Sequence, residues 1–183
     1  MDSSNASRSG MTHLYYGPGK GKTTAAMGLV MRAAGRNFDI SVLQFMKGHD
    51  EVGERYGEIE LLRDHEAVEI LQFPTRHAES VDDLNEHEQE TLLDGIDTAR
   101  RLIVDGKSDL VVLDELTLLC LLEVVDPADV IDLFEQKPET VELVVTGRTA
   151  PPEFVDAATY VTYMAAVKHP YQQGVTARAG IEF

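Results

Sequence analysis

The sequence is poor in the residues that cross-link a chain or carry it into a membrane. It has one cysteine, Cys120, and no tryptophan. A single cysteine cannot form a disulfide within the chain, which fits a reducing cytoplasm, and its apolar neighbours predict a core position. No apolar run approaches the length of a membrane span, so we expect no membrane partner. The six histidines show no pair at helical i, i+4 spacing, which argues against a histidine metal site.

Basic residues are scarce beside acidic ones. The chain has 16 Lys and Arg against 32 Asp and Glu, which gives a formal net charge of −16 at pH 7. A surface of this charge repels nucleic acid and anionic membranes, so we expect neither as a partner. One interpretation is an ordinary acidic cytosolic protein. The other is a halophilic protein, because concentrated salt screens most of the self-repulsion, and the excess of arginine over lysine favours this one.

The order of apolar and polar segments predicts the fold class. With 183 residues we expect one domain over residues 12–183, after a polar, disordered tail over residues 1–11. Apolar runs predict strands at 13–16, 39–45, 68–73, 109–115, 141–146 and 160–164. Helical patterns lie between them, at 25–34, at 84–104, from Asp126-Pro127 onward and at 153–158. This alternation predicts an α/β fold, a mostly parallel sheet with helices on both faces.

A glycine-rich turn joins the first predicted strand to the first predicted helix. It is typical of a phosphate-binding P-loop, in which backbone N–H groups and a helix N-terminus face an anion and a lysine adds a full charge. The expected nucleotide-binding residues are Gly17, Pro18, Gly19, Lys20, Gly21, Lys22, Thr23 and Thr24. Tyr16 stands where the usual pattern has its first glycine, so the loop is shortened. The alternative is a glycine-rich turn without a ligand.

Two further strand ends carry candidate site residues. In open α/β sheets, ligands bind beyond the carboxyl ends of the strands, which makes Gln44 and Lys47 candidates for nucleotide binding. A solvated strand end is the other reading of this pair. Arg148 follows the strand at 141–146 and could meet a polyphosphate through its bidentate fork, or form a structural ion pair instead.

Asp114 and Glu115 end a buried apolar strand, as in the Walker B arrangement that holds Mg²⁺ beside a P-loop. Thr23 would offer its hydroxyl to the same ion. We expect these three residues to form the metal site, with either carboxylate as the direct ligand. The alternative is that the Asp-Glu pair only caps the following helix.

Several segments together resemble the P-loop type of ATP:cob(I)alamin adenosyltransferase, also called corrinoid adenosyltransferase. The segments are Gly-Lys-Gly-Lys-Thr-Thr-Ala-Ala at 19–26, Gln-Phe-Met-Lys-Gly at 44–48, Val-Leu-Asp-Glu-Leu at 112–116, Thr-Gly-Arg at 146–148 and the ending Lys-His-Pro … Gly-Ile-Glu-Phe. The resemblance runs from about Leu14 to Phe183. It implies a RecA-like P-loop NTPase fold, usually dimeric.

The resemblance also implies a reaction. The 5′-deoxyadenosyl group of ATP moves to the Co(I) of a corrinoid, and triphosphate leaves, in adenosylcobalamin biosynthesis or salvage. Because Co(I) is itself the nucleophile, no general base is needed. The leaving group gathers negative charge, and Lys22 and Arg148 are suited to stabilise it together with Mg²⁺ or Mn²⁺. A reductase that supplies Co(I) is a further expected partner.

The sequence departs from its relatives at the corrin side. Relatives carry an aromatic pair, one member a tryptophan, after the third strand, whereas Thr75 to Asp83 offer only Arg76 and His77 as large side chains. Two other functions stay open on the sequence alone. One is a small P-loop kinase or ATPase acting at the γ-phosphate, for which Gln44 is the only early candidate to orient an acceptor. The other is a non-catalytic, ATP-dependent switch module.

Overall fold

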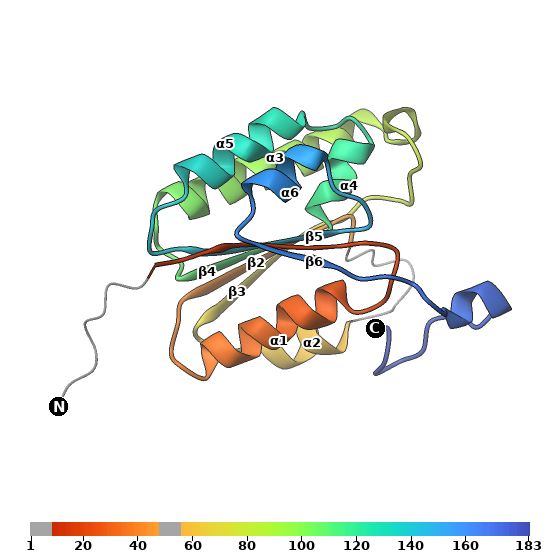
Figure 1. Cartoon of the computed structure of the whole chain (residues 1–183), viewed down its shortest axis with the longest axis horizontal. Coiled ribbons are helices and arrows are strands. Elements are labelled where there is room, and N and C mark those ends of the chain that lie inside the picture. Colours follow the sequence, from red (N-terminus) through yellow and green to blue (C-terminus); the bar gives the residue numbers. More distant parts are fainter. Residues whose placement is uncertain (1–8, 48–55) are drawn as a thin grey trace.

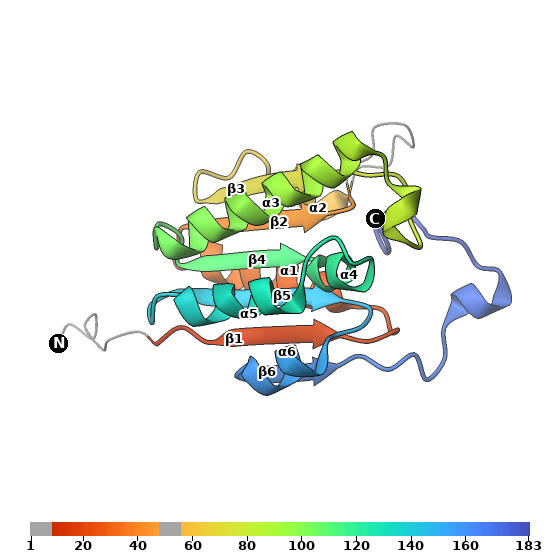
Figure 2. The ribbon, with the colours of Figure 1, turned by 90° about the horizontal axis from the view of Figure 1, so that it is seen from above.

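Six parallel strands form the centre of the molecule. The computed structural model describes residues 9–47 and 56–183. The strand order is β3-β2-β4-β5-β1-β6, and every neighbouring pair is parallel (Figures 1 and 2). The strands are β1 (Thr12–Tyr16), β2 (Ile40–Phe45), β3 (Val68–Phe73), β4 (Leu110–Asp114), β5 (Glu142–Gly147) and β6 (Tyr160–Tyr163). The predicted fold class, a parallel α/β sheet, is confirmed.

Helices cover both faces of this sheet. The helices α1 (Lys22–Ala34) and α2 (Gly57–Leu62) lie on one face. The other face carries α3 (Glu86–Val104), α4 (Leu116–Leu121), α5 (Pro127–Gln136) and α6 (Pro152–Ala157) (Figure 1). Short 3₁₀ turns occur at η2 (Val81–Asp83) and η3 (Pro170–Gln173). Among the described residues, no helix is long and apolar enough to cross a membrane.

The alternation of side chains along the strands produces two hydrophobic clusters, one on each face. Val42, Val112 and Val144 are neighbours across β2, β4 and β5 and belong to the cluster under α1. Leu43 and Leu113, one residue further along the strands, belong to the larger cluster under the other helices. Because the central strands are buried on both sides, they read in the sequence as continuous apolar runs. The sheet is therefore fixed in register by both of its faces.

Parallel pairing also decides where the functional side chains gather. The carboxyl ends of all strands lie at one edge of the sheet, and the register makes Gln44 a direct neighbour of Asp114 and Tyr16 of Gly147. The P-loop, the end of β4 and the end of β5 therefore meet at this edge. The segment after β6 runs out beyond the same edge and turns back toward the sheet (Figures 1 and 2).

All six predicted strands are present with bounds that agree within one residue, and α1 begins at Lys22, three residues before the helix predicted at 25–34. The helix predicted over 84–104 begins at Glu86, because residues 81–83 form a 3₁₀ turn and Asn85 caps the helix. The strand predicted over 109–115 ends at Asp114, since Glu115 has a left-handed φ of 63°. Helix α4 was not predicted: it is apolar on nearly all sides and shows no helical period. Cys120 on this helix is half-buried against the larger cluster, and burial raises the pKa of its thiol to about 12.

The predicted tail over residues 1–11 falls mostly outside the described residues, as do residues 48–55. The last three tail residues are described, and two of them are held by the domain. Gly10 donates its N–H to the carbonyl of Glu139 at 2.6 Å, and Met11 donates to Glu142 Oε2 at 2.9 Å. The division of the chain into tail and domain stays a prediction.

Candidate active site

The glycine-rich turn between β1 and α1 is shaped by the chain that passes beside it. Gly17 and Gly21 have φ values of 120° and 115°, which residues other than glycine rarely adopt. A Cβ on Gly17 or on Gly19 would lie 2.6 Å from the carbonyl oxygen of Met164. Gly19 donates its N–H to that oxygen at 2.7 Å, so this N–H faces the protein. The glycines thus serve close packing of the loop against the segment after β6 as well as backbone conformation.

Lys22 lies under this loop. Its ammonium donates to the carbonyl oxygens of Gly17 at 2.8 Å and Gly19 at 2.9 Å, and the residue is only 8% exposed. Burial lowers the pKa of Lys22, and the positive charges of Arg148 and Lys47 add to this effect against Glu115 and Asp114. The only direct hydrogen-bond acceptors of Lys22 in the described chain are thus carbonyl dipoles, so an anion that approaches this buried ammonium is strongly stabilised.

Asp114 is the most heavily bonded side chain of the site and is fully buried. One carboxylate oxygen, Oδ1, accepts from Thr23 Oγ1 at 3.0 Å and from Thr146 Oγ1 at 2.7 Å. The other, Oδ2, accepts from Gln44 Nε2 at 3.1 Å and from Lys47 Nζ at 2.5 Å. Four donors from three segments of the chain thus keep this buried charge solvated by protein groups.

Lys47 binds two of the predicted metal ligands at once. Besides Asp114, its ammonium donates to Thr23 Oγ1 at 2.9 Å, and it lies 5.5 Å from the centre of the Tyr56 ring. Burial by itself lowers the pKa of Lys47, but the charge and hydrogen bond of Asp114, with Glu115 and Tyr56, outweigh it and raise the pKa. The side chain is 12% exposed, so the reading of Gln44 and Lys47 as a solvated strand end is wrong.

Glu115 follows Asp114 and makes no side-chain hydrogen bond to the donors of Asp114 within the described chain. It occupies the N-cap position of α4, yet its side chain makes no capping hydrogen bond, so the reading as a simple helix cap is wrong. Its Oε2 is buried and has no hydrogen-bond partner among the described residues. Burial raises the pKa of Glu115, Asp114 adds to this, and Lys47 opposes it. An unpartnered buried carboxylate oxygen beside Asp114 is what a cation site provides.

These oxygens fit a magnesium ion. A hydroxyl at Thr23 with carboxylates at Asp114 and Glu115 is a set of hard oxygen donors, and Mg²⁺ commonly takes one or two carboxylates and keeps the remainder for water and phosphate. Within residues 9–47 and 56–183, no group of three or more His, Cys, Asp and Glu gathers as a metal site. A ligand set for zinc is therefore not built in the described chain.

Arg148 follows β5 at the same edge. It is exposed and has no hydrogen bond or ion pair within the described part of the chain, so the structure gives no support for a structural ion pair there. Its charge reaches Lys22 and Glu115, since it lowers the pKa of both. Arg148 is thus near the site and available to a ligand.

Three of the predicted loop residues make no side-chain hydrogen bond to the other site residues within the described chain. Lys20 donates to the carbonyl oxygen of Ile181 at 2.8 Å, which ties the loop to the end of the chain. Pro18 and Thr24 are exposed.

The structure adds two residues that sequence reasoning missed. Thr146 donates to Asp114 and accepts the N–H of Glu115 at 2.9 Å, and Gln72 donates to Gln44 Oε1 at 2.9 Å. Thr146 lies in the quoted Thr-Gly-Arg segment, where only the arginine drew attention. Gln72 could also have been found from the sequence, because it lies beside Gln44 when the predicted strands at 39–45 and 68–73 are paired in parallel.

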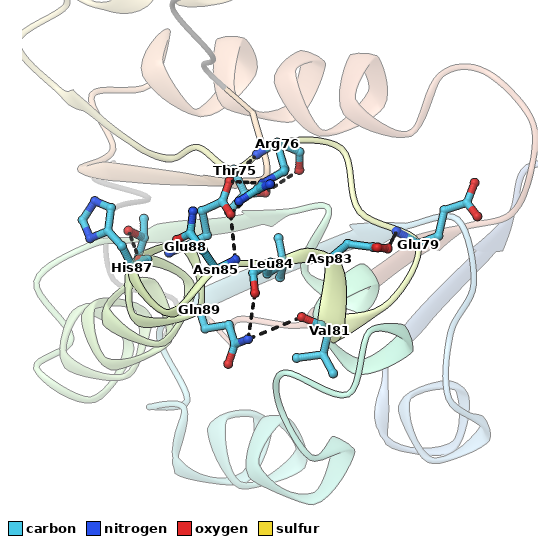
Figure 3. A network of polar contacts seen from close by, with 11 residues as sticks. Thr75, Arg76, Glu79, Val81, Asp83, Leu84, Asn85, His87, Glu88 and Gln89 are labelled. Carbon is cyan, nitrogen blue, oxygen red and sulfur yellow. Dashed lines mark hydrogen bonds and ion pairs between the residues drawn. The ribbon is translucent and has the colours of Figure 1, made fainter.

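The segment after β3 has no aromatic residue to offer a planar ligand. Phe73 stacks on Phe45 in the core, with ring centres 5.5 Å apart, and Gly95 of α3 leaves room for both rings. Arg76 is bonded to Glu88 (Figure 3), and His77 is exposed. The segment from Thr75 to Asp83 thus presents no Phe, Tyr or Trp side chain against which a corrin face could pack.

Comparisons with known proteins agree along nearly the whole chain. Residues 8–183 match the family described as ATP:corrinoid adenosyltransferase BtuR/CobO/CobP. The chain is 32% identical over 170 residues to a corrinoid adenosyltransferase of Sinorhizobium, covering 91% of this chain and 77% of that protein. It is 31% identical over 174 residues to the corrinoid adenosyltransferase of Escherichia coli K12, covering 95% and 86%.

A solved structure supports the fold alone. A KaiC-like protein from Pyrococcus horikoshii has a TM-score of 0.53 at 18% identity, covering 86% of this chain and 73% of that one, consistent with the predicted RecA-like arrangement. The family match and the curated relatives decide the family, and this chain belongs to the ATP:corrinoid adenosyltransferases.

Proposed function

We propose that this chain transfers the 5′-deoxyadenosyl group of ATP to the Co(I) centre of a reduced corrinoid and releases triphosphate. The observation that carries the proposal is the meeting of Lys22, Lys47 and Arg148 at one edge of the sheet, in a chain that matches this family over residues 8–183. Three positive charges at a glycine loop suit a polyphosphate, and an otherwise strongly acidic chain has few other places for one.

In this reaction the bond between C5′ and its oxygen breaks, a cobalt–carbon bond forms, and the electron pair of the broken bond stays on the triphosphate. Co(I) attacks without losing a proton, so the chain needs no general base. Its task is to stabilise the charge that grows on the leaving oxygen, and Lys22 and Arg148 are the groups we assign to it. Gly17, Pro18, Gly19, Lys20, Gly21, Lys22, Thr23, Thr24, Gln44 and Lys47 are the proposed nucleotide-binding set.

Thr23 with Asp114 or Glu115 would hold Mg²⁺, or Mn²⁺ in its place. When bound, the ion supplies charge neutralisation on the phosphates. Within the protein, Thr146 and Gln44 orient the carboxylate of Asp114 by hydrogen bonds at 2.7 and 3.1 Å. A carboxylate fixed in this way presents its oxygens in one orientation before the nucleotide binds.

The alternative of a kinase or ATPase depended on Gln44 to orient an acceptor. Gln44 was its only early candidate, but its amide donates to Asp114 and accepts from Gln72, and the residue is fully buried. Both ends of this side chain are thus engaged in the described network. The switch-module reading has no observation of its own in its favour.

We also propose, from the family resemblance, that the chain acts as a homodimer, receives Co(I) from a reductase and works in the cytoplasm. The exposed edge strand β6, with Tyr160 at 53% and Tyr163 at 58% exposure, is consistent with a contact to another chain. Light scattering on the purified protein tests the dimer directly.

Product analysis tests the proposed reaction. We expect incubation with ATP and chemically reduced cobalamin to yield triphosphate and a light-sensitive cobalt–carbon bond in equal amounts. Release of ADP and phosphate without a corrinoid product would contradict the proposal and favour chemistry at the γ-phosphate.

A further inference from the structure

The ammonium of Lys47 lies where the proposed metal would have to bind. It is 2.9 Å from the hydroxyl oxygen of Thr23 and 2.5 Å from Oδ2 of Asp114, and these are two of the three proposed metal ligands. Mg²⁺ binds such oxygens at about 2.0–2.1 Å. An ion on these two oxygens would therefore overlap the ammonium and repel it at close range.

We infer that Lys47 is an exchangeable internal cation: it neutralises Asp114 before the nucleotide binds, gives up its place to Mg²⁺, and then pairs with the triphosphate. This inference rests on the proposed function, because it takes Mg²⁺ with ATP as the species that enters. It adds a role for Lys47 that is separate from simple nucleotide binding.

Burial explains why a cation is needed there at all times. Asp114 is fully buried, and a buried carboxylate that loses its positive partner is strongly destabilising. Its other three donors, Thr23, Gln44 and Thr146, are neutral groups. Only Lys47 brings a full charge into contact with this carboxylate among the described residues.

The side chain can make the exchange. Lysine carries a compact charge on a flexible four-carbon stem, whereas the planar fork of arginine would fit this spot less well. Met46 before it has a left-handed φ of 56°, which ends β2 and turns the chain over the sheet edge. Lys47 also lies close enough to Lys22 to lower its pKa, so the phosphate-binding side of the site is adjacent.

The arrangement has a consequence for the order of binding. A free divalent ion must displace the ammonium of Lys47 from Asp114 and Thr23, and no phosphate is then present to pair with the displaced ammonium. The complex of Mg²⁺ with ATP brings the metal and the new partner of Lys47 together. The site therefore selects the metal–nucleotide complex over the free ion, in a chain whose charge of −16 attracts cations generally.

Binding of Mn²⁺ to the purified full-length chain without nucleotide tests the inference. We expect Lys47→Met, which keeps most of the length of the side chain and removes its charge, to bind Mn²⁺ about tenfold tighter or more. Lys107→Met is the matched control, because Lys107 is 78% exposed, contacts Asp105 and changes the net charge by the same amount. Its Mn²⁺ affinity should stay within about twofold of the unmodified chain.

The double variant Lys47→Met with Asp114→Asn separates two failures. If the double variant no longer binds Mn²⁺ more tightly than the unmodified chain, the exchange at Asp114 is supported. If the tighter Mn²⁺ binding persists, Asp114 is not the ligand, the exchange at Asp114 is overturned, and Glu115 remains as the proposed metal ligand. If Lys47→Met alone shows no gain, while Asp114→Asn still weakens binding of Mn²⁺ with ATP, the proposed metal site stands and the exchange is overturned.

A readout on the unmodified chain guards against a variant that folds poorly. Lys47 is 12% exposed and bonded, so an amine-acetylating reagent should modify it slowly. Saturating Mn²⁺ without nucleotide should speed its acetylation several-fold, measured by mass spectrometry, with Lys107 unchanged as the internal standard. Equal rates with and without Mn²⁺ would contradict displacement of the ammonium.

Discussion

At the scale of single residues, the buried charges of the site differ in how many hydrogen-bond partners the protein gives them. The carboxylate of Asp114 has four donors, the ammonium of Lys22 has only two carbonyl oxygens, and Glu115 has a buried oxygen with no partner in the described chain. Lys22 and Glu115 are therefore the groups with most to gain from a ligand. Asp114 contributes to the fold and to the site together.

Replacing Lys22 separates function from folding. Lys22→Ala removes a charge that serves the phosphates and leaves the two carbonyl oxygens of the loop to water. We expect triphosphate release to fall about 10²- to 10³-fold with an unchanged circular dichroism spectrum. Lys137→Ala is the comparison, since that lysine bonds carbonyl oxygens of Gly10 and Val141 at the opposite edge of the sheet and should keep the rate. Full turnover in Lys22→Ala would remove the P-loop from the mechanism.

The thiol of Cys120 provides a pH test of burial. Burial raises its pKa to about 12, so the folded chain holds the neutral thiol while the unfolded chain ionises near the ordinary value. This contribution to stability is complete below the unfolded pKa of about 8.5 and is lost as pH rises toward 12. We expect a thiol reagent at pH 8 to label native protein far more slowly than urea-unfolded protein. Similar labelling rates would show that Cys120 is accessible.

At the scale of elements, the turn between β3 and α3 is tied together by two capping boxes. Ser80 and Asp83 form one, and Asn85 and Glu88 form the other, with each side chain accepting the backbone N–H of its partner. Arg76 donates from its guanidinium and its backbone N–H to Glu88 (Figure 3). The start of α3 is thus held at a fixed place beside the sheet edge.

The cap of α3 predicts a measurable loss of stability. Asn85 Oδ1 accepts the N–H of Glu88 at 2.9 Å, and Asn85→Ala should lower the free energy of unfolding by about 1 kcal/mol. Glu90→Ala, at an exposed position one turn into the helix, should change it by less than about 0.5 kcal/mol. Urea denaturation measures both. Equal effects of the two substitutions would mean that the cap does not determine where α3 begins.

The same network predicts a dependence on acid. Hydrogen bonds from the backbone N–H groups of Arg76 and Asn85 lower the pKa of Glu88. A carboxylate with a lowered pKa adds stability above its ordinary pKa and loses it as the pH falls through the lowered one. The difference in stability between the unmodified chain and Glu88→Gln should therefore be present at pH 6 and shrink below about pH 4. A difference that is constant down to pH 3 would show that it does not come from ionisation.

Sequence patterns predicted the elements where burial is two-sided or periodic. The central strands and the amphipathic α3 were found because their apolar residues follow a regular pattern, and Asp114 was found because it ends one of these strands. Helix α4 has no polar face and shows no period. The contact of Lys47 with Thr23 joins residues 24 positions apart through the parallel sheet, and no local pattern records it.

At the scale of the whole molecule, the net charge of −16 is unevenly distributed over the chain. The charges of Lys47 and Arg148 both act on Lys22 at the edge of the sheet where the site lies, which leaves the remaining surface more acidic still. Such a surface opposes compaction through its self-repulsion in dilute buffer. The halophilic interpretation of the sequence stays a prediction.

Salt provides its test. Screening has a length of about 10 Å at 0.1 M ionic strength and about 3 Å at 1 M, so added KCl should weaken the repulsion. We expect the Tm to rise by several degrees between low salt and about 1 M KCl, at which the charges of a small domain are largely screened. A Tm that stays level or falls over this range would favour an ordinary acidic protein.

The central claim is that C5′ of ATP ends on cobalt, and one measurement follows that carbon directly. ATP carrying ¹³C at C5′ is incubated with the enzyme and chemically reduced cobalamin, and the ¹³C resonance is recorded in the dark. We predict that the ¹³C chemical shift changes from that of an oxygen-bound methylene to that of a cobalt-bound methylene as triphosphate accumulates, and that light cleaves the cobalt–carbon bond. A label that stays bound to oxygen while ADP accumulates would contradict the account.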